Sequence, residues 1–341
     1  MIAYTNPSTT SSTSVNPQVQ TVSASPQTVA PLNNETAQQI VKEATLQKLI
    51  DGSIKQDEAL SIITGVRIQD MQDGHVIVDH NSSTQQFAAS INKLPVALLV
   101  LQDLRSHKLS MTQTMTWLPS DVRGGYGVYD QPGAPTSASL QDVLFDMLNH
   151  SGNTAVRVLV NYGLGGAAAV NTRWAQYSQL NDTRLQPLDG PGNRFYLGNS
   201  TPSDSMWAMW VLFDHSDQYS HFIKHALATN IFTDYGVRSQ LAGNNWIVLV
   251  NKVGILDDPT GDNRHDVGII YNKKKHVSYA YSFMTTSPES NAAATPQAEQ
   301  SLKDMGADLL RFAGDTQKSA SHAASPLAAS NALKPEQKVL Y

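Results

Sequence analysis

The chain has 341 residues, no cysteine and a formal net charge of −5. The absence of cysteine excludes disulfides, thiolate metal sites, iron–sulfur clusters and cysteine nucleophiles. The charge is mild and spread along the chain, with one basic run at Lys273 to Lys275, so no nucleic-acid partner is expected.

Both ends of the chain have compositions typical of disordered segments. Residues 1–33 are rich in Ser, Thr, Pro, Gln and Asn, and residues 316–341 are rich in Ala, Ser, Pro and Lys. We interpret them as a stem and a tail around one domain at residues 35–315, which is long enough to bury a substantial core. Such stems often tether domains outside the cytoplasm, so we expect an extracytoplasmic protein, although no signal peptide or transmembrane segment is visible.

Three elements are predicted before the first chemical motif. Apolar residues at helical spacing predict a helix over residues 35–50, and β-type runs at 65–69 and 75–78 predict two strands. The dipeptide Asp73-Gly74 between these strands is typical of a tight hairpin turn.

The segment from Ser90 to Lys93 places a hydroxyl and an amine three residues apart, on one face of a first helical turn. The helix that follows is apolar on nearly all sides, so it is expected to be buried. Burial lowers the pKa of a lysine, which would let Lys93 act as the base for a Ser90 nucleophile. The alternative is a serine cap beside a solvated lysine, because a serine-rich chain contains roughly one or two such spacings by chance.

A largely helical region runs from Ser90 to about Phe213, interrupted by loops at 119–137 and 181–203. Within it, an amphipathic helix ends at His150 and is followed by Ser151-Gly152-Asn153, which supplies a second hydroxyl and an amide. Tyr126 lies in a glycine loop and is either an aromatic wall at a site entrance or a surface tyrosine.

Strands at 246–253, 266–271 and 276–284 and a helix at 295–313 complete the domain. Lys252-Val253-Gly254 ends the first of these strands and places an ammonium at a sheet edge.

Strands at both ends of the domain with helices between them predict an α+β fold of the αβα sandwich type. We expect a five-stranded antiparallel sheet flanked by the terminal helices, with an inserted all-helical lobe. The α/β lobe would comprise residues 35–88 and 205–315, and the helical lobe residues 89–204. A site would then lie where the two lobes meet.

The three motifs, in the order Ser-x-x-Lys, Ser-x-Asn and Lys-x-Gly, resemble those of the class A serine β-lactamases and penicillin-recognising D,D-peptidases. Their separations are 151 − 90 = 61 and 252 − 90 = 162 residues. Residues 89–95 are similar to the family's nucleophile helix, and residues 149–155 to its second motif. Thr201-Pro202 followed by Met206 is similar to the start of the helix after the family's omega loop.

The resemblance implies a role for each motif residue. Ser90 would attack a β-lactam or an acyl-D-Ala-D-Ala peptide, Lys93 would accept its proton, and Ser151 would relay a proton to the leaving nitrogen. The substrate would be bound by Asn153, Lys252, Gly254 and Ile255, with Tyr126 at the entrance. The backbone N–H groups of Ser90 and Ile255 would form the oxyanion hole.

The chain departs from the family in its third motif, where Val253 replaces the usual threonine or serine. The lost charge-assisted hydrogen bond to the substrate carboxylate is worth roughly 1.5 to 3 kcal/mol. We expect weaker substrate binding, or a replacement by Arg264 or His265.

A second departure concerns the glutamate that activates water in class A β-lactamases. Its place falls near residues 184–189, yet the chain has no glutamate between Glu58 and Glu289. Asp182 and Asp189 are the nearby carboxylates, and each is one methylene shorter than glutamate. We therefore expect an acyl-enzyme that is slow to deacylate.

Three functions remain open from the sequence: a β-lactamase-like serine hydrolase, a D-Ala-D-Ala carboxypeptidase or related peptidase, and a binding module that is acylated without turnover. We expect a monomer without a cofactor. The aspartates at 257, 258, 262 and 266 do not have the spacing of a calcium loop, so no metal is predicted.

Overall fold

The computed structural model describes residues 34–188, 194–257 and 261–315. The stem at 1–33, the tail at 316–341 and Asp189 lie outside the described residues, and the lobe boundaries stay predictions. No helix in the described ranges is long and apolar enough to cross a membrane.

The α/β part of the domain is built on five antiparallel strands in the spatial order β2-β1-β10-β9-β8. This confirms the predicted sheet. The strands are β1 (Ile63–Asp70), β2 (Val76–His80), β8 (Ile247–Leu256), β9 (Asp262–Asn272) and β10 (Val277–Ser287).

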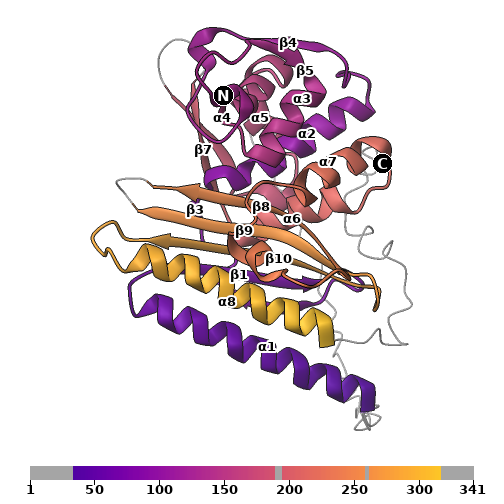
Figure 1. The fold of residues 1–341 in the computed structure, drawn as a ribbon, viewed down its shortest axis with the longest axis vertical. Helices are drawn as coiled ribbons and strands as arrows, with labels where there is room; N and C mark the ends of the chain where they lie inside the picture. The colour runs from indigo at the N-terminus through magenta and orange to yellow at the C-terminus, as the bar shows by residue number, and fades with distance from the viewer. Residues whose placement is uncertain (1–33, 189–193, 258–260, 316–341) are drawn as a thin grey trace, which may run out of the picture.

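The terminal helices α1 (Asn34–Glu58) and α8 (Ala294–Asp315) lie side by side on one face of the sheet (Figure 1). Their inward faces join a buried cluster with the sheet, to which α1 contributes Leu46 and Ile50 and α8 contributes Leu302 and Leu309. Burial of such side chains contributes about 1.5 to 3 kcal/mol each and holds this layer in place.

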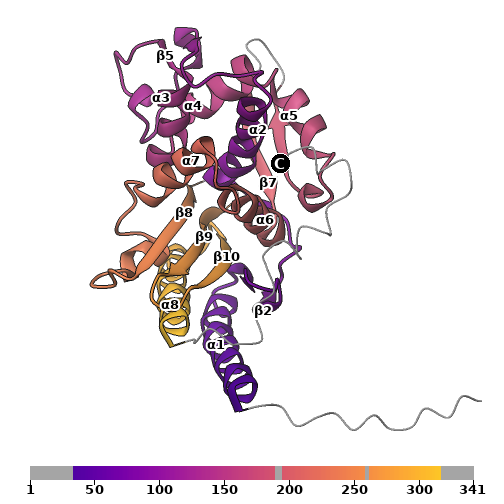
Figure 2. The ribbon, with the colours of Figure 1, turned by 90° about the vertical axis from the view of Figure 1, so that its right-hand side faces the viewer.

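The opposite face of the sheet is covered by α6 (Pro202–Phe213) and the helical lobe, so the sheet lies between two helical layers (Figures 1 and 2). The centre of the lobe is α2 (Lys93–Arg105), whose residues from Lys93 to Leu101 are all buried. The other helical segments are η1 (Ala89–Asn92), α3 (Leu140–Phe145), η4 (Asp146–His150), α4 (Asn153–Val158), η5 (Leu159–Gly163), α5 (Ala167–Trp174) and α7 (Gln218–Ala228). Short segments complete the chain: β4 (Thr114–Thr116), β5 (Ser137–Ser139), η2 (Pro119–Asp121), η3 (Val128–Asp130), η6 (Ser178–Leu180) and η7 (Gly236–Gln240).

The prediction of a loop over residues 181–203 is wrong. This segment contains β6 (Arg184–Pro187) and β7 (Phe195–Ser200), which form a three-stranded sheet with β3 (Gln86–Phe87). The Gly, Pro and Asn content concealed these strands. Gly198 has φ +64°, and a Cβ there would lie 2.0 Å from the Arg184 carbonyl oxygen, so the close pairing of β6 with β7 needs glycine.

Candidate active site

A cleft of about 810 Å³ is lined by segments from both lobes. Ser90, Ser151, Asn153 and Tyr126 line it from the helical lobe, and Ile255 lines it from β8. Lys93 and Lys252 are buried behind this lining and direct their ammonium groups to Ser90 and Ser151. The structure therefore brings the three distant motifs together.

Ser90 and Lys93 have the spacing of a nucleophile and its base. Nζ of Lys93 lies 2.9 Å from Oγ of Ser90. The residue before the nucleophile, Ala89, has φ +45°, a left-handed conformation that costs a non-glycine residue about 1 to 3 kcal/mol. It is held by its neighbour Ala88, whose N–H donates to the Gly198 carbonyl at 2.7 Å. The small β3-β7 sheet thus fixes the turn that presents Ser90.

Lys93 is fully buried, and polar oxygens surround its amine. Nζ lies 2.6 Å from the carbonyl oxygen of Ser151, 3.2 Å from its Oγ and 3.0 Å from Oδ1 of Asn153. Burial lowers the pKa of Lys93 to about 7, against the opposing charges of Asp130 and Asp146. At neutral pH a large fraction of Lys93 is therefore uncharged and able to accept the proton of Ser90.

Ser151 links the two buried lysines. It has φ +61° and ψ +35° at the end of η4, and its Oγ lies 2.9 Å from Nζ of Lys252. Burial and the charge of Lys93 lower the pKa of Lys252 well below its ordinary value. A continuous path of polar atoms thus runs from Ser90 through Lys93 and Ser151 to Lys252, as a proton relay requires.

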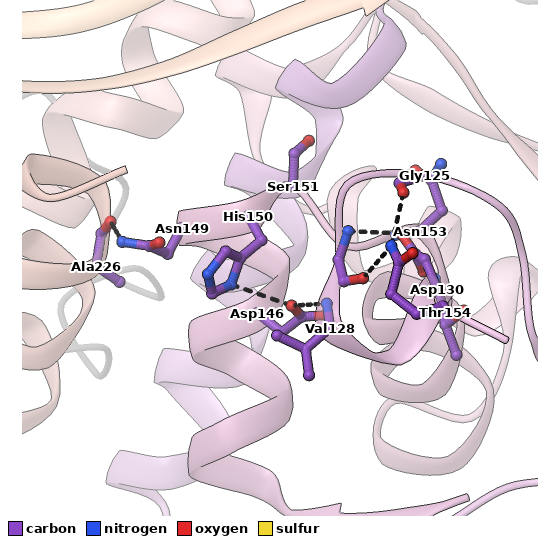
Figure 3. Close-up of polar contacts among 12 residues, drawn as sticks. Gly125, Val128, Asp130, Asp146, Asn149, His150, Ser151, Asn153, Thr154 and Ala226 are labelled. Atoms are coloured by element: carbon purple, nitrogen blue, oxygen red, sulfur yellow. Dashed lines mark hydrogen bonds and ion pairs between the residues drawn. The ribbon is translucent and has the colours of Figure 1, made fainter. Parts of the chain in front are cut away.

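Two buried aspartates, which the sequence analysis missed, support the second motif (Figure 3). Asp130 accepts hydrogen bonds from the backbone N–H groups of Gly127, Asn153 and Thr154 at 2.9, 3.0 and 2.7 Å. These bonds fix the first turn of α4, and with it the amide of Asn153. The signal in the sequence was an aspartate only three residues from a conspicuous Gly-x-Gly loop.

The second aspartate, Asp146, packs its carboxylate against Gly152, where a side chain would leave no room for it. It accepts from the N–H of Val128 at 2.7 Å (Figure 3). A Cβ on Gly152 would lie 2.2 Å from its Oδ2. Burial, followed by the charge of Asp130, raises the pKa of Asp146. Because an acid interrupts the apolar helix before Ser151, this residue was detectable in the sequence.

Asn92, inside the first motif, was also missed. Its buried Nδ2 donates to the carbonyl oxygens of Leu197 at 2.5 Å and Asn199 at 3.0 Å. These bonds connect η1 to β7 and so hold the nucleophile Ser90 in place beside this strand.

The glycine of the third motif allows β8 to approach the nucleophile. A Cβ on Gly254 would lie 3.1 Å from the His265 ring and 3.2 Å from the Ala88 carbonyl oxygen. His265 is buried, and burial lowers its pKa to about 4. Nδ1 of this neutral ring accepts from the N–H of Thr285, so Nε2–H donates to the carbonyl of Phe87 at 2.8 Å.

The prediction that Arg264 or His265 replaces the missing hydroxyl is wrong. Neither residue is part of the cleft lining among the described residues. Both ring nitrogens of His265 form hydrogen bonds with backbone groups. Arg264 forms ion pairs with Asp257 at 2.6 Å and Glu299 at 2.8 Å. Val253 does line the cleft, and its apolar side chain supplies no hydrogen bond.

The suggestion that Asp182 could activate water in place of the glutamate is also wrong. Its Oδ1 accepts from Nε2 of Gln85 at 3.0 Å, and it does not contribute to the cleft lining. Across the described part of the chain, the lining contains no carboxylate. Gln186 and Leu188 line the cleft in the region where the glutamate was sought.

Tyr126 forms a wall of the cleft together with Phe232. Its side chain is 62% exposed, and the two ring centroids lie 5.3 Å apart in an edge-on arrangement at 81°. Phe232 also places its ring 5.6 Å from Nζ of Lys252. The geometry favours the interpretation of Tyr126 as an entrance wall over an isolated surface tyrosine.

The predicted aspartate loop gathers no set of metal ligands among its described members. Asp262 accepts from the hydroxyl of Thr295, Asp257 pairs with Arg264, and buried Asp266 accepts from Tyr281. In the described ranges, convergent ligand atoms occur at Asp70, Asp73 and His75, on the β1-β2 hairpin and away from the cleft. His221 and His225 form a helical i, i+4 pair on α7 that the sequence analysis overlooked, and no third ligand converges with them within the part of the chain that the structure describes.

The chain matches the model of the β-lactamase enzyme family over residues 43–313. No curated protein is significantly similar to it in sequence. Among solved structures, a β-lactamase from Sphaerobacter thermophilus has 21% identity and a TM-score of 0.65, over 78% of this chain and 97% of that one. A β-lactamase from Xanthomonas campestris has 18% identity and a TM-score of 0.65, over 79% and 98%. A PBP-A point mutant in an acyl-enzyme complex with penicillin G has 16% identity and a TM-score of 0.62, over 79% and 97%.

Proposed function

Since the chain belongs to the β-lactamase enzyme family, whose model matches residues 43–313, we propose that it is a serine hydrolase that forms an acyl-enzyme with β-lactams at Ser90. The observation that carries this proposal is the distance of 2.9 Å between Oγ of Ser90 and Nζ of Lys93, an amine whose pKa burial lowers to about 7.

In the proposed acylation, uncharged Lys93 takes the proton of Ser90 as Oγ bonds to the lactam carbonyl carbon. The N–H groups of Ser90 and Ile255 stabilise the oxyanion, and each such donor is worth roughly a hundredfold or more in rate. The carbon–nitrogen bond then breaks. The proton held by Lys93 passes through Ser151 to the leaving nitrogen, and Lys252 stabilises the charge that develops on Ser151 during this transfer.

Deacylation is proposed to be slow because the described cleft lining offers no carboxylate to activate water. The amide of Gln186 cannot accept a proton at neutral pH. Loss of a general base costs roughly 10² to 10⁴ in rate, so the acyl-enzyme should persist at least about a hundred times longer than one that is hydrolysed with such a base.

Intact-mass spectrometry during incubation with penicillin G tests this proposal. The expected result is a single adduct of the full mass of the drug that persists after excess drug is removed and is absent in Ser90→Ala. Rapid steady-state hydrolysis of nitrocefin would contradict slow deacylation, and an adduct that survives in Ser90→Ala would contradict the assigned nucleophile.

A D-Ala-D-Ala carboxypeptidase is the second candidate function. The absence of a carboxylate from the described lining favours it, because a peptidase does not require rapid hydrolysis of a β-lactam adduct. Release of D-Ala from an acyl-D-Ala-D-Ala peptide would distinguish it from a β-lactamase, and a stable adduct without peptide cleavage would indicate a binding module. Because such peptides are cell-wall components, we also propose an extracytoplasmic location, which fractionation of the native host would test.

A further inference from the structure

One end of the cleft is apolar, and it lies beside Ser151, the residue proposed to pass a proton to the leaving atom. Phe232, Val253 and Tyr126 line the cleft there. Nζ of Lys252 lies 2.9 Å from Oγ of Ser151 and 5.6 Å from the centre of the Phe232 ring. The same Nζ lies 2.9 Å from the carbonyl oxygen of Val253. We call the surface formed by Phe232, Val253 and Tyr126 the leaving-group wall.

The ring of Phe232 is held in place by the strand that carries Lys252. The backbone N–H of Phe232 donates to Oδ1 of Asn230 at 3.1 Å, and Nδ2 of Asn230 donates to the carbonyl oxygen of Asn251 at 3.0 Å. Asn230 is buried, and Asn251 directly precedes Lys252 on β8. The ring of Tyr126 packs edge-on against Phe232 at 5.3 Å. The aromatic part of the wall therefore has a fixed position relative to the ammonium.

The ammonium of Lys252 is occupied by protein groups. Of its three N–H donors, two are directed to Oγ of Ser151 and to the carbonyl oxygen of Val253. The Phe232 ring lies at a cation–π distance from the same amine. The side chain of Lys252 is buried and does not belong to the described lining. A carboxylate on the leaving group would therefore find no available donor on this lysine.

The other groups that could bind such a carboxylate are replaced or already paired. Val253 stands at the position of the hydroxyl residue in the third motif, and its side chain offers no hydrogen bond. Arg264 forms ion pairs with Asp257 at 2.6 Å and with Glu299 at 2.8 Å. A guanidinium beside two carboxylates attracts a third anion only weakly, because their charges oppose the approach.

The arginines of the lining gather in another part of the cleft. Arg123, Arg157 and Arg194 contribute to the lining. After burial, the charge of Arg157 has the largest effect on the pKa of Arg123, whereas that of Lys93 has the largest effect on the pKa of Lys252. The arginines thus lie near one another rather than near Lys252, and the leaving-group wall itself contains no charged side chain.

We propose that the cleft hydrolyses carboxylic esters whose leaving group is an uncharged, apolar alcohol or phenol, in preference to acyl donors whose leaving group carries a carboxylate. An acyl-D-Ala-D-Ala peptide belongs to the second kind, because the D-Ala that departs carries a carboxylate. The inference rests on the proposed function for the nucleophile and the proton path, and it adds a further activity, that of an esterase.

In the ester reaction, Oγ of Ser90 bonds to the carbonyl carbon, and the bond from that carbon to the alcohol oxygen breaks. The proton of Ser90 passes through Lys93 and Ser151 to this oxygen, and the neutral alcohol departs. Water then takes the place of the alcohol and bonds to the acyl carbon. Its proton returns along the same path to Oγ of Ser90 as the acyl bond breaks, which releases a carboxylic acid and the free enzyme.

Esters should turn over without the carboxylate that the described lining lacks. In a penicillin adduct the leaving nitrogen stays attached to the acyl group through the rest of the opened ring, so it continues to fill the place that water needs. The alcohol of an ester is not attached and leaves this place free. The same cleft can therefore hold a penicillin adduct for a long time and still hydrolyse an ester.

The test compares two aryl esters of N-phenylacetylglycine. One releases 3-hydroxybenzoate, and the other releases the methyl ester of 3-hydroxybenzoate, so the leaving groups differ by one carboxylate. Release of the phenol is followed by absorbance with the full chain, and each kcat/KM is divided by the rate of hydroxide-catalysed hydrolysis of the same ester. We expect the uncharged leaving group to be preferred at least about tenfold, because the carboxylate would lose its water without gaining a partner.

The preference should persist at about 0.5 M salt, where long-range repulsion by the net charge of the chain is screened. Val253→Thr adds a hydroxyl to the leaving-group wall and should lower the preference by at least about threefold. Val248→Thr is the matched control, because Val248 is on the same strand outside the described lining and should leave the preference unchanged.

The outcomes separate this inference from the proposed function. If the wild-type protein hydrolyses the uncharged ester, Ser90→Ala does not, and no penicillin forms an adduct, the β-lactam proposal fails and the esterase inference stands. If penicillin G forms the adduct and neither ester is hydrolysed, the inference fails and the proposed function stands. Equal rates for the two esters, a preference that salt abolishes, or equal preferences in Val253→Thr and Val248→Thr would also overturn the inference.

Discussion

The substitution Asn153→Asp tests whether Lys93 acts as an uncharged base. Oδ1 of Asn153 lies 3.0 Å from Nζ of Lys93, so the change adds a negative charge with almost no change in shape. A carboxylate at this distance favours the charged lysine and raises its pKa by about 1 to 3 units. The acylation rate should therefore reach half its plateau at roughly pH 8 to 10 in the variant.

The magnitude follows from the fraction of uncharged lysine. At its ordinary pKa of 10.5, a lysine is uncharged at pH 7 in roughly one molecule in three thousand, whereas a pKa of about 7 leaves about half of the molecules uncharged. Acylation of the wild-type protein should rise with pH, pass its midpoint near pH 7 and then level off. At pH 7 the variant should be slower by roughly fivefold to five-hundredfold.

The assay is the second-order rate of labelling by a fluorescent penicillin from about pH 5 to about pH 10.5, a range that includes the midpoints predicted from the lysine pKa. Asn153→Ala controls for lost contacts, because it removes the amide without adding charge and should slow labelling without moving the midpoint upward. Lys48→Gln on the exposed face of α1 makes the same change in net charge far from the cleft. A midpoint that is identical in wild type and Asn153→Asp would refute the role of Lys93.

Three further changes test other parts of the structure. In a urea titration, Gly152→Ala should reduce the free energy of unfolding by about 1 to 3 kcal/mol, because the new Cβ would lie 2.2 Å from Oδ2 of Asp146. The control Gly52→Ala on α1 should stabilise the protein, because a Cβ there meets nothing within 4 Å. Equal effects of these two substitutions would contradict the packing described around Asp146. Gln186→Glu places a carboxylate in the cleft lining and should shorten the lifetime of the penicillin adduct by at least about tenfold, as measured by mass spectrometry; an unchanged lifetime would show that the missing base does not limit deacylation. The hydrogen bond from His75 to Glu43 at 3.1 Å raises the pKa of His75 to about 9 in the folded protein, so its contribution to stability is fully present below about pH 6.5 and is lost as the pH rises through about 9. His75→Gln should flatten the melting temperature over this window, and a variant that keeps the full slope would contradict the assignment.

The sequence predicted the elements that have a strong pattern. The five strands have β-type runs, and the buried helix after Ser90 is apolar on nearly all sides, so hydrophobic periodicity was sufficient to place them. It failed for β6 and β7, whose pairing depends on Gly198 at positive φ and on contacts with β3 that are far away in the sequence.

The motif residues were predictable from their order, while the contacts made by the groups that hold them were not. Asp130, Asp146 and Asn92 act through backbone N–H and carbonyl groups of distant segments. Such contacts exist only after the chain has folded, and no spacing rule encodes them. The suggestion of Arg264 or His265 as a substitute failed for the same reason, because closeness in sequence to the third motif does not determine which side of β9 faces the cleft.

The central claim is that Oγ of Ser90 is the atom that becomes acylated. A crystal structure of the protein soaked with penicillin G tests it most directly. We predict continuous density from Ser90 to an opened lactam ring, with the acyl carbonyl oxygen between the N–H groups of Ser90 and Ile255. An intact ring in the cleft, or a covalent bond to any other side chain, would contradict the account.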